Sequence, residues 1–186
     1  MSQPTRLRAD AVLRGYVHAK DENRPHLLRE VFSVDADLQV SNRAATIALP
    51  AATHGREAIA DVLVRRFAQT YENIYSFYMA RPPGQATRFL CDWLVGMSEK
   101  ERQHVRVGCG RYDWTFQTES PQLASHLVIT IHAMQVLPPG QFDSIFAWLR
   151  QLDYPWSSAA AAMKLAPSVE MLAPVLQYLG RNEGGA

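Results

Sequence analysis

Four consecutive segments in the middle of the chain have the composition of β-strands and are joined by short turns. Each is rich in β-branched and aromatic residues, and together they cover residues 74–80, 87–97, 105–117 and 125–137. The connections are turn-like, as at Pro82-Pro83-Gly84. Parallel neighbours would require long crossovers, so the pattern predicts an antiparallel meander. Glycine relieves crowding where a strand bends, so Gly96, Gly108 and Gly110 predict a curved sheet.

Helical periodicity dominates the residues before this meander. Apolar residues at helical spacing predict a first helix over residues 7–20, with Lys20 on one of its polar faces. A short second helix is predicted at residues 25–32, and the clearest helix of the chain at residues 53–71. Two extended segments complete this half, at residues 35–40 and 44–49.

The chain from Pro138 onward returns to helical patterns. Its apolar residues predict three further amphipathic helices. This tail is too small to bury a core alone. We therefore expect an α+β domain over residues 1–137, with a C-terminal helical extension over residues 138–186 packed on it.

Composition restricts the partners. The hydrophobic content of 47% and net charge of +1 are those of a folded globular protein, and no basic stripe of the kind that binds nucleic acid is visible. No stretch approaches the ~20 apolar residues of a membrane helix, and the N-terminus does not resemble a signal peptide. The two cysteines favour a reduced, cytoplasmic location over a disulfide framework.

Motifs for metals and cofactors are missing from the sequence. No pair of histidines has the HxH or HxxxH spacing of a zinc or iron site. The glycines at Gly108 and Gly110 lie within a predicted strand and lack the following helix that would bind a phosphate. We therefore expect neither a metal nor a cofactor.

The order of elements, two helices, a short strand, a third helix and four antiparallel strands, resembles the nuclear transport factor 2-like superfamily. Four segments are similar in sequence to its SnoaL-like polyketide-cyclase branch, at residues 14–19, 31–38, 55–59 and 108–116. The resemblance covers roughly residues 7–137. It implies a cone-shaped curved antiparallel sheet with three helices of the N-terminal half across its concave face, enclosing a pocket for a small, largely apolar molecule.

Strand alternation sorts the candidate site residues by face. By the resemblance, the face of the third long strand that carries Tyr112 and Trp114 should line the cone. The first helix would contribute Tyr16. The neighbouring strands would add Leu90 and Asp92 on one side, and Thr130, His132 and Met134 on the other.

Two known reaction patterns of the superfamily match the chain poorly. In the ketosteroid-isomerase pattern, Tyr16 matches the family's tyrosine, but Val40 occupies the position of the base and Tyr112 that of the protonated acid. In the limonene-epoxide-hydrolase pattern Asp92 matches one acid, but Leu90 and His132 replace the other two members. Both reactions are disfavoured.

The remaining catalytic hypothesis is a dyad of Asp92 and His132 assisted by Tyr16 and Tyr112. A partly desolvated carboxyl and an imidazole can exchange protons near neutral pH, which suits cofactor-free dehydratase, cyclase or isomerase chemistry. Each residue also has a structural explanation. Asp92 can pair with an arginine, His132 can be a satisfied core residue, and the tyrosines can simply pack.

A non-catalytic binding or structural module is the alternative, with the cone filled by its own aromatic side chains. In either case we expect a homodimer, because the outer sheet face is predicted to be too apolar to remain in water. The residues expected on that face are Val105, Val107, Cys109, Leu127, Ile129 and Ile131.

Overall fold

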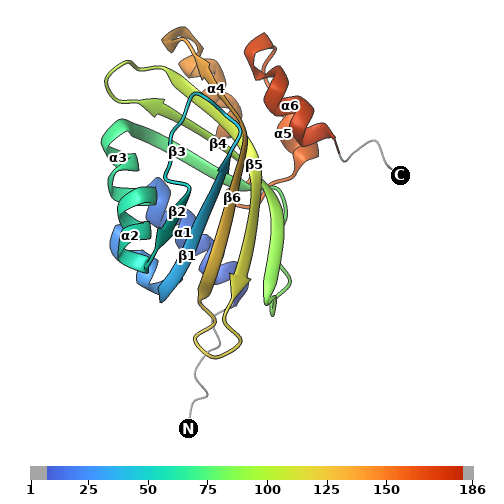
Figure 1. The fold of residues 1–186 in the computed structure, drawn as a ribbon. Coiled ribbons are helices and arrows are strands. Elements are labelled where there is room, and N and C mark those ends of the chain that lie inside the picture. The colour runs from blue at the N-terminus through green and yellow to red at the C-terminus, as the bar shows by residue number, and fades with distance from the viewer. Residues whose placement is uncertain (1–7, 182–186) are drawn as a thin grey trace.

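The structure is a computed structural model that describes residues 8–181. Six strands form one curved sheet in the order β2-β1-β6-β5-β4-β3 (Figure 1). Strands β3 to β6 form the predicted antiparallel meander, whereas β1 pairs with β6 in parallel, so the sheet is mixed. The strands are β1 (Phe32–Asn42), β2 (Ala52–His54), β3 (Tyr71–Tyr78), β4 (Arg88–Glu99), β5 (Val105–Phe116) and β6 (Ala124–Leu137).

Helices of the N-terminal half pack on the concave face. They are α1 (Ala9–Asp21), the 3-10 turn Pro25–Glu30, α2 (Arg56–Ala60) and α3 (Phe67–Thr70). The start predicted for α1 at Leu7 lies outside the described residues, as do both outer ends of the expected division at residues 1–137 and 138–186.

The single helix predicted at residues 53–71 is interrupted by a π-helical turn, Asp61–Arg65. The π-helical turn is closed by a hydrogen bond that the Arg66 amide donates to the Asp61 carbonyl, five residues earlier in the chain. Val62, Leu63 and Val64 are all buried, which a regular amphipathic helix does not achieve with three successive residues.

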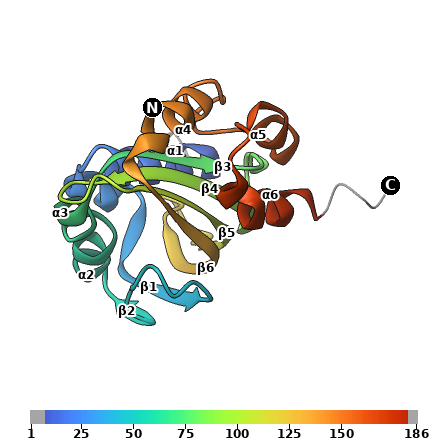
Figure 2. The same ribbon diagram turned by 90° about the horizontal axis from the view of Figure 1, so that it is seen from above.

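The C-terminal helices cover part of the convex face instead of extending the concave layer (Figure 2). They are α4 (Phe142–Leu149), α5 (Ala159–Leu165) and α6 (Ala173–Gly180). Trp148, Leu149 and Leu179 form one buried cluster with Val105 and Val107 of the sheet. The prediction that this apolar part of the outer face is open is wrong, because the chain's own tail covers it.

The predicted faces are correct for β5 and wrong for its two neighbours. Residues directly opposite in an antiparallel pair share a face. Tyr112 lies opposite Cys91 of β4 and Ile129 of β6, so Cys91 and Ile129 face the interior. Asp92 and Thr130 are therefore on the opposite side. A register error of one residue reverses every side chain of a strand, and this is the error in the predicted faces of β4 and β6.

A bulge in β6 restores Met134 to the interior. Gly110 pairs with Ile131, but Cys109 pairs with Ala133, so His132 is the extra residue. Beyond it Met134 lies opposite Gly108 on the concave face. Leu127, Ile129 and Ile131, which were expected on the outer face, belong to the concave core.

Candidate functional site

The structure divides the predicted site residues between the two faces of the sheet. Tyr16, Tyr112, Trp114 and Met134 are buried in the concave core, as expected. The remaining predicted residues lie elsewhere: Asp92, His132, Thr130 and Leu90, the last of which is 45% exposed. The expectation that Asp92 and His132 meet Tyr16 in one interior site is therefore wrong.

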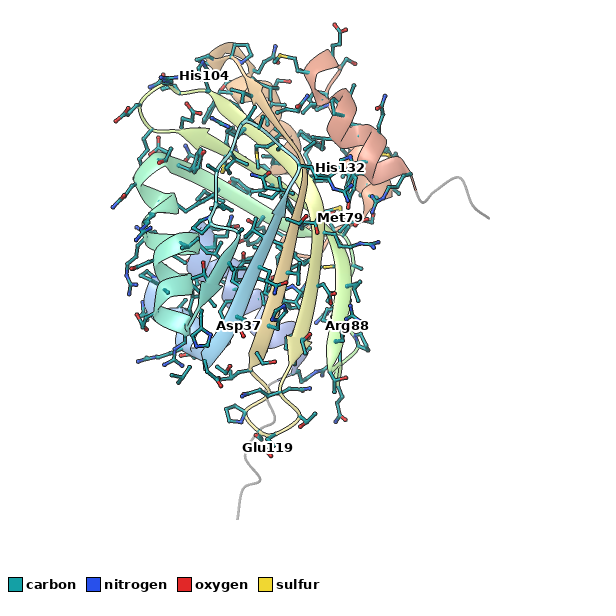
Figure 3. The ribbon with its side chains drawn as sticks, in the orientation of Figure 1. Asp37, Met79, Arg88, His104, Glu119 and His132 are labelled. Carbon is teal, nitrogen blue, oxygen red and sulfur yellow. The ribbon has the colours of Figure 1, made fainter. Side chains whose placement is uncertain are left out.

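Asp92 instead fastens α6 to the convex face. Arg181 donates from one nitrogen to both carboxylate oxygens, at 2.8 Å each, and the Tyr178 hydroxyl donates at 3.1 Å. Arg111 approaches to 3.5 Å. The His132 ring lies 4.4 Å from that of Tyr178, beside α6 (Figure 3). Burial raises the pKa of Tyr178 to about 12, so its hydroxyl remains a donor at neutral pH. The acceptors of Asp92 are thus occupied.

The concave side encloses a cavity of about 40 Å³ between α1, the π-helical turn and the sheet. Tyr16 and Lys20 line it from α1, and Trp93 and Met134 line it from the sheet. Most of the remaining lining is aliphatic or aromatic. A water molecule requires ~10–15 Å³, so the space holds a few solvent-sized groups.

Two hydrogen-bond donors at this cavity have no partner. The Tyr16 hydroxyl and the Trp93 Nε1 are buried and donate no hydrogen bond within residues 8–181. The Tyr112 hydroxyl lies close enough to that of Tyr16 to oppose in part the effect of burial on its pKa. Burial raises the pKa of Tyr16, which keeps its hydroxyl protonated at neutral pH. An unpaired buried donor typically costs ~1–3 kcal/mol. Both residues line the cavity, so it is the place where a bound molecule can offer an acceptor to these donors.

The sequence prediction missed two residues of this site, Trp93 and Lys20. Trp93 was missed because the predicted face of β4 was reversed. Lys20 is 7% exposed, and its Nζ donates to the Ser76 Oγ at 3.1 Å and lies 4.5 Å from the centre of the Phe67 ring. Burial lowers its pKa, and the Asp21 carboxylate, 3.9 Å away, counteracts this in part. The available signal was its spacing, because a residue four positions after Tyr16 lies on the same face of a helix.

Asp21 continues this buried network. It accepts from the Ser76 amide and the Ser76 hydroxyl, both at 2.7 Å, and from the Tyr154 hydroxyl at 2.9 Å. Tyr154 belongs to the C-terminal extension, which therefore reaches the end of α1. Burial raises the pKa of Asp21, although Lys20 and these hydrogen bonds oppose the shift. The Ser76 hydroxyl connects the amine to the carboxylate.

An irregular segment at residues 43–51 covers the mouth of the cavity and replaces the strand predicted at residues 44–49. We call it the strap. Ile47 and Leu49 of the strap line the cavity. The Asn42 side chain donates to the Ile47 carbonyl at 2.7 Å, and the Thr46 hydroxyl donates to the Met134 carbonyl. The strap is therefore held to the sheet by a few polar contacts.

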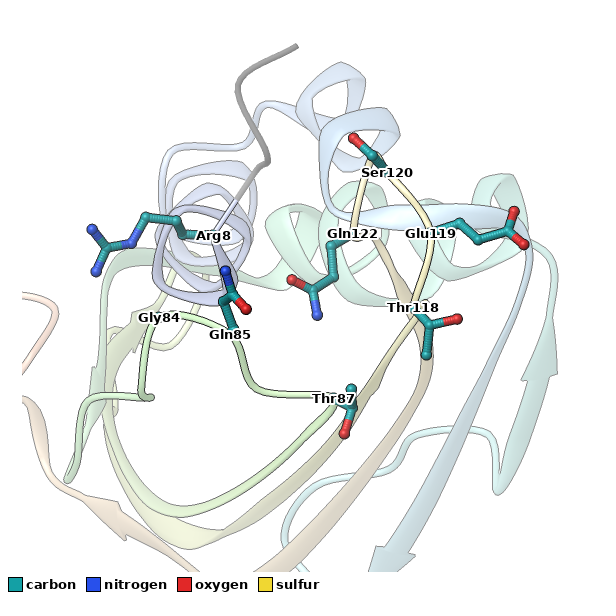
Figure 4. Close-up of a pocket in the computed structure, with 8 residues that line it drawn as sticks. All are labelled: Arg8, Gly84, Gln85, Thr87, Thr118, Glu119, Ser120 and Gln122. Atoms are coloured by element: carbon teal, nitrogen blue, oxygen red, sulfur yellow. The ribbon is translucent and has the colours of Figure 1, made fainter. Parts of the chain in front are cut away.

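A second hollow lies between the loops at the opposite end of the sheet (Figure 4). It measures about 150 Å³ and is lined by polar groups such as Thr87, Thr118 and Gln122. The Gln122 amide is already bonded to the Ala86 carbonyl at 3.0 Å. None of the described residues lining this hollow carries a buried donor or acceptor without a partner. It is the weaker candidate.

Two further features bear on the predicted partners. Among residues 8–181, no helix is long and apolar enough to cross a membrane. The same residues contain no group of three or more His, Cys, Asp or Glu side chains placed to hold a metal ion.

A curved sheet wrapped around an interior cavity, with helices across its concave face, defines the class of cone-shaped α+β folds. No protein-family model and no curated protein matches this chain. Solved structures do match. A nuclear transport factor 2-like superfamily protein from Salmonella enterica serovar Typhimurium LT2 has a TM-score of 0.52 at 14% identity, over 64% of this chain and 85% of that one.

A protein named as an enzyme is also among the similar structures. A type 2 hexachlorocyclohexane dehydrochlorinase, LinA, has a TM-score of 0.54 at 13% identity, over 68% of this chain and 84% of its own. TsrD from Streptomyces laurentii has a TM-score of 0.51 at 12% identity, over 69% of this chain and 91% of its own. The chain has the nuclear transport factor 2-like fold, which confirms the resemblance at the level of fold.

Proposed function

We propose that this chain binds a small, largely apolar molecule in the cone, with a hydrogen-bond acceptor of that molecule directed at Tyr16 and Trp93. The observation that carries the proposal is the pair of buried donors without partners at one apolar cavity. A carbonyl or carboxylate oxygen supplies what both donors lack. The surrounding aliphatic side chains favour an apolar body.

The size of the cavity restricts the ligand. Sites for drug-sized molecules measure ~300 Å³ or more, whereas this cavity measures about 40 Å³. A ligand of a few heavy atoms fits with small movements of flexible side chains such as Met134. A larger one requires the strap to move Ile47 and Leu49 away from the mouth.

If the chain is an enzyme, its acid-base groups are those of the cone. Tyr16 can stabilise a developing oxyanion, and Lys20 with Asp21 can move a proton. This arrangement retains the predicted cofactor-free dehydratase, cyclase or isomerase chemistry but replaces the dyad of Asp92 and His132. Among proteins with this fold, LinA is named as a dehydrochlorinase.

The test uses the indole N–H signals of the four tryptophans in a proton–nitrogen NMR correlation spectrum. Titration with cyclopentanone should shift the Trp93 signal, because its Nε1 gains an acceptor. The Trp148 signal is a built-in control, since its Nε1 already donates to the Ala162 carbonyl at 3.0 Å. Cyclopentane, which has the same ring without the oxygen, should shift Trp93 much less.

Variants separate binding from folding. Tyr16→Phe should weaken the cyclopentanone response by about tenfold, the equivalent of one hydrogen bond of ~1.4 kcal/mol. Its free energy of unfolding should fall by no more than ~0.5 kcal/mol, because the lost hydroxyl had no partner. Tyr75→Phe is the matched control, because Tyr75 packs against the convex-side cluster. An unchanged Trp93 signal at saturating ketone contradicts the proposal.

The second candidate is a non-catalytic structural module, favoured by the aromatic filling of the cone. Trp114 stacks on Phe32 at 5.8 Å and on Phe116 at 6.2 Å, and Tyr16 meets it edge-on at 5.1 Å. A Trp93 signal that responds to no small molecule, together with a stable fold, is the result expected for this candidate.

The homodimer and the cytoplasmic location stay predictions. The apolar residues on which the dimer prediction depended are buried within the chain. The part of the outer face that remains exposed is therefore more polar than the sequence predicted. It includes Leu90, Arg111 and Thr130. Light scattering should give the mass of a dimer for the native chain and of a monomer for Leu90→Glu if this face is the interface.

A further inference from the structure

We propose that Lys20 forms a reversible imine with a small aldehyde or ketone that enters the cone. The inference rests on the proposed binding function and deepens it, because it names the carbonyl as the acceptor and assigns Lys20 a covalent role. Lys20 lines the same cavity as the two unpartnered donors.

The placement of Tyr16 and Lys20 suits an attack on a carbonyl. Both belong to α1, one turn apart, and both side chains line the cavity. Because both side chains line one cavity, a carbonyl oxygen that accepts from the Tyr16 hydroxyl belongs to a molecule that lies beside Lys20. Hydrogen bonding of the oxygen polarises the carbonyl and stabilises the oxyanion that forms.

Burial shifts Lys20 toward the neutral amine, which is the nucleophilic form, by lowering its pKa. The Asp21 carboxylate and the face of the Phe67 ring favour the charged form and oppose this shift in part. A desolvated lysine with a lowered pKa is the type of lysine that forms Schiff bases. Its hydrogen bond to Ser76 holds the nitrogen in place.

The reaction needs no oxidant, reductant or cofactor. The nitrogen lone pair attacks the carbonyl carbon, and the oxygen takes up a proton to give a carbinolamine. The amine nitrogen releases its two protons in all, and the oxygen takes up the second of them. The carbon–oxygen bond then breaks, a carbon–nitrogen double bond forms, and the oxygen leaves as water. The Ser76 hydroxyl accepts from Lys20 and donates to Asp21, so it provides a path for the protons. The raised pKa of Asp21 suits a carboxylate that accepts and returns them.

The sequence offers internal controls. The chain has three lysines, and Lys100 and Lys164 are both exposed. Their amines are open to water and are not desolvated as that of Lys20 is. Selective reaction at Lys20 therefore distinguishes the cone from the surface within one sample.

The experiment treats the full-length protein with propanal and sodium cyanoborohydride near pH 7, which reduces an imine to a stable propyl-amine. Peptide mapping by mass spectrometry then locates the propyl group. Labelling at Lys20 should exceed that at Lys100 and Lys164 by about tenfold, because only the Lys20 amine is desolvated and lines the cavity beside Tyr16. Lys20→Arg should lose the fast-labelled site. Tyr16→Phe should label Lys20 more slowly while leaving the two surface lysines unchanged.

The outcomes separate this inference from the proposed binding function. Equal or weaker labelling of Lys20 relative to Lys100 and Lys164 overturns the imine, whatever else is observed. If the Trp93 signal still shifts with cyclopentanone in that case, binding stands without covalent chemistry; if it does not, both proposals fall. Should Lys20→Arg not fold, the peptide map of the native protein and the Tyr16→Phe rates still decide the question.

Discussion

The two faces of the sheet use polar side chains in opposite ways. On the convex face Asp92 is surrounded by Arg181, Tyr178 and Arg111, so its acceptors are occupied. On the concave face Tyr16 and Trp93 border a cavity and donate to nothing among the described residues. A satisfied polar cluster holds elements together, whereas the two unpartnered donors beside the cavity are the reason for proposing a ligand there.

Two aspartates, one on each side of the sheet, differ in the direction of their pKa shifts. Arg88 donates to Asp113 on the convex face with both its Nε and a terminal nitrogen, and this lowers the pKa of Asp113. Asp21 lies inside, and its burial raises its pKa even though Lys20 is close. The ionised form of the convex acid is stabilised by its arginine, whereas the ionised form of the interior acid is destabilised by burial.

The largest effect should come from the convex layer, at Trp148. Its ring is buried between the tail helices and the sheet, and its Nε1 donates to the Ala162 carbonyl. Trp148→Ala should lower the free energy of unfolding by ~3–5 kcal/mol, through lost burial and a cavity. Trp148→Phe, which keeps most of the packing, should cost much less. Urea denaturation followed by circular dichroism measures both, and a loss below ~1 kcal/mol for the alanine variant would mean that the tail is not an integral layer.

The sequence predicted the strands well because their composition and turns are local signals. It predicted the faces of β5 correctly, since Tyr112, Trp114 and Phe116 alternate with more polar residues. The faces of β4 and β6 depend on cross-strand register and on the bulge at His132. Register is a tertiary property, so alternation within one strand does not reveal it.

The candidate site was predicted only in part for related reasons. Tyr16 and Tyr112 were placed in the cone by the resemblance to the superfamily, and the structure buries both there. Met134 was assigned with the wrong face of β6 and lies inside only because of the bulge at His132. Lys20 was assigned to a polar face because a lysine is rarely buried. Its burial depends on Ser76 and Asp21 meeting at the end of α1, and no local pattern encodes that contact.

The interior acid should appear in the pH dependence of stability. The raised pKa of Asp21 means that the folded state binds its proton more tightly than the unfolded state, whose pKa is near 3.8. Its contribution to stability therefore falls as pH rises from that value through the folded pKa. Asp21→Asn removes this pH dependence. Between the unfolded and folded pKa values of Asp21, the free energy of unfolding of the variant should therefore rise relative to that of the native protein by up to ~1.4 kcal/mol per pH unit.

Denaturation at several pH values from 4 upward measures the difference between the two proteins. The lost contacts to Ser76 and Tyr154 add a constant offset, which the pH comparison excludes. For Asp113→Asn the difference in free energy of unfolding from the native protein should change with pH in the opposite direction. The lowered pKa of Asp113 contributes stability above the unfolded pKa that is lost as pH falls through the folded one. A parallel pH profile for Asp21→Asn and the native protein would remove the distinction between the interior and the convex acid.

The smallest effect should come from Asp92, the residue that the sequence favoured as a catalyst. Arg181 and Arg111 are 31% and 49% exposed, so water already screens these ion pairs. Asp92→Ala should lower the free energy of unfolding by about 1 kcal/mol.

The response of Trp93 to cyclopentanone should remain unchanged in this variant, because Asp92 lies on the other face of the sheet from Tyr16. Arg181→Ala should behave alike, since it removes the other half of the contact. If Asp92→Ala instead abolished the Trp93 response at unchanged stability, the convex cluster would be coupled to the cone, and the division between a structural and a binding face would be wrong.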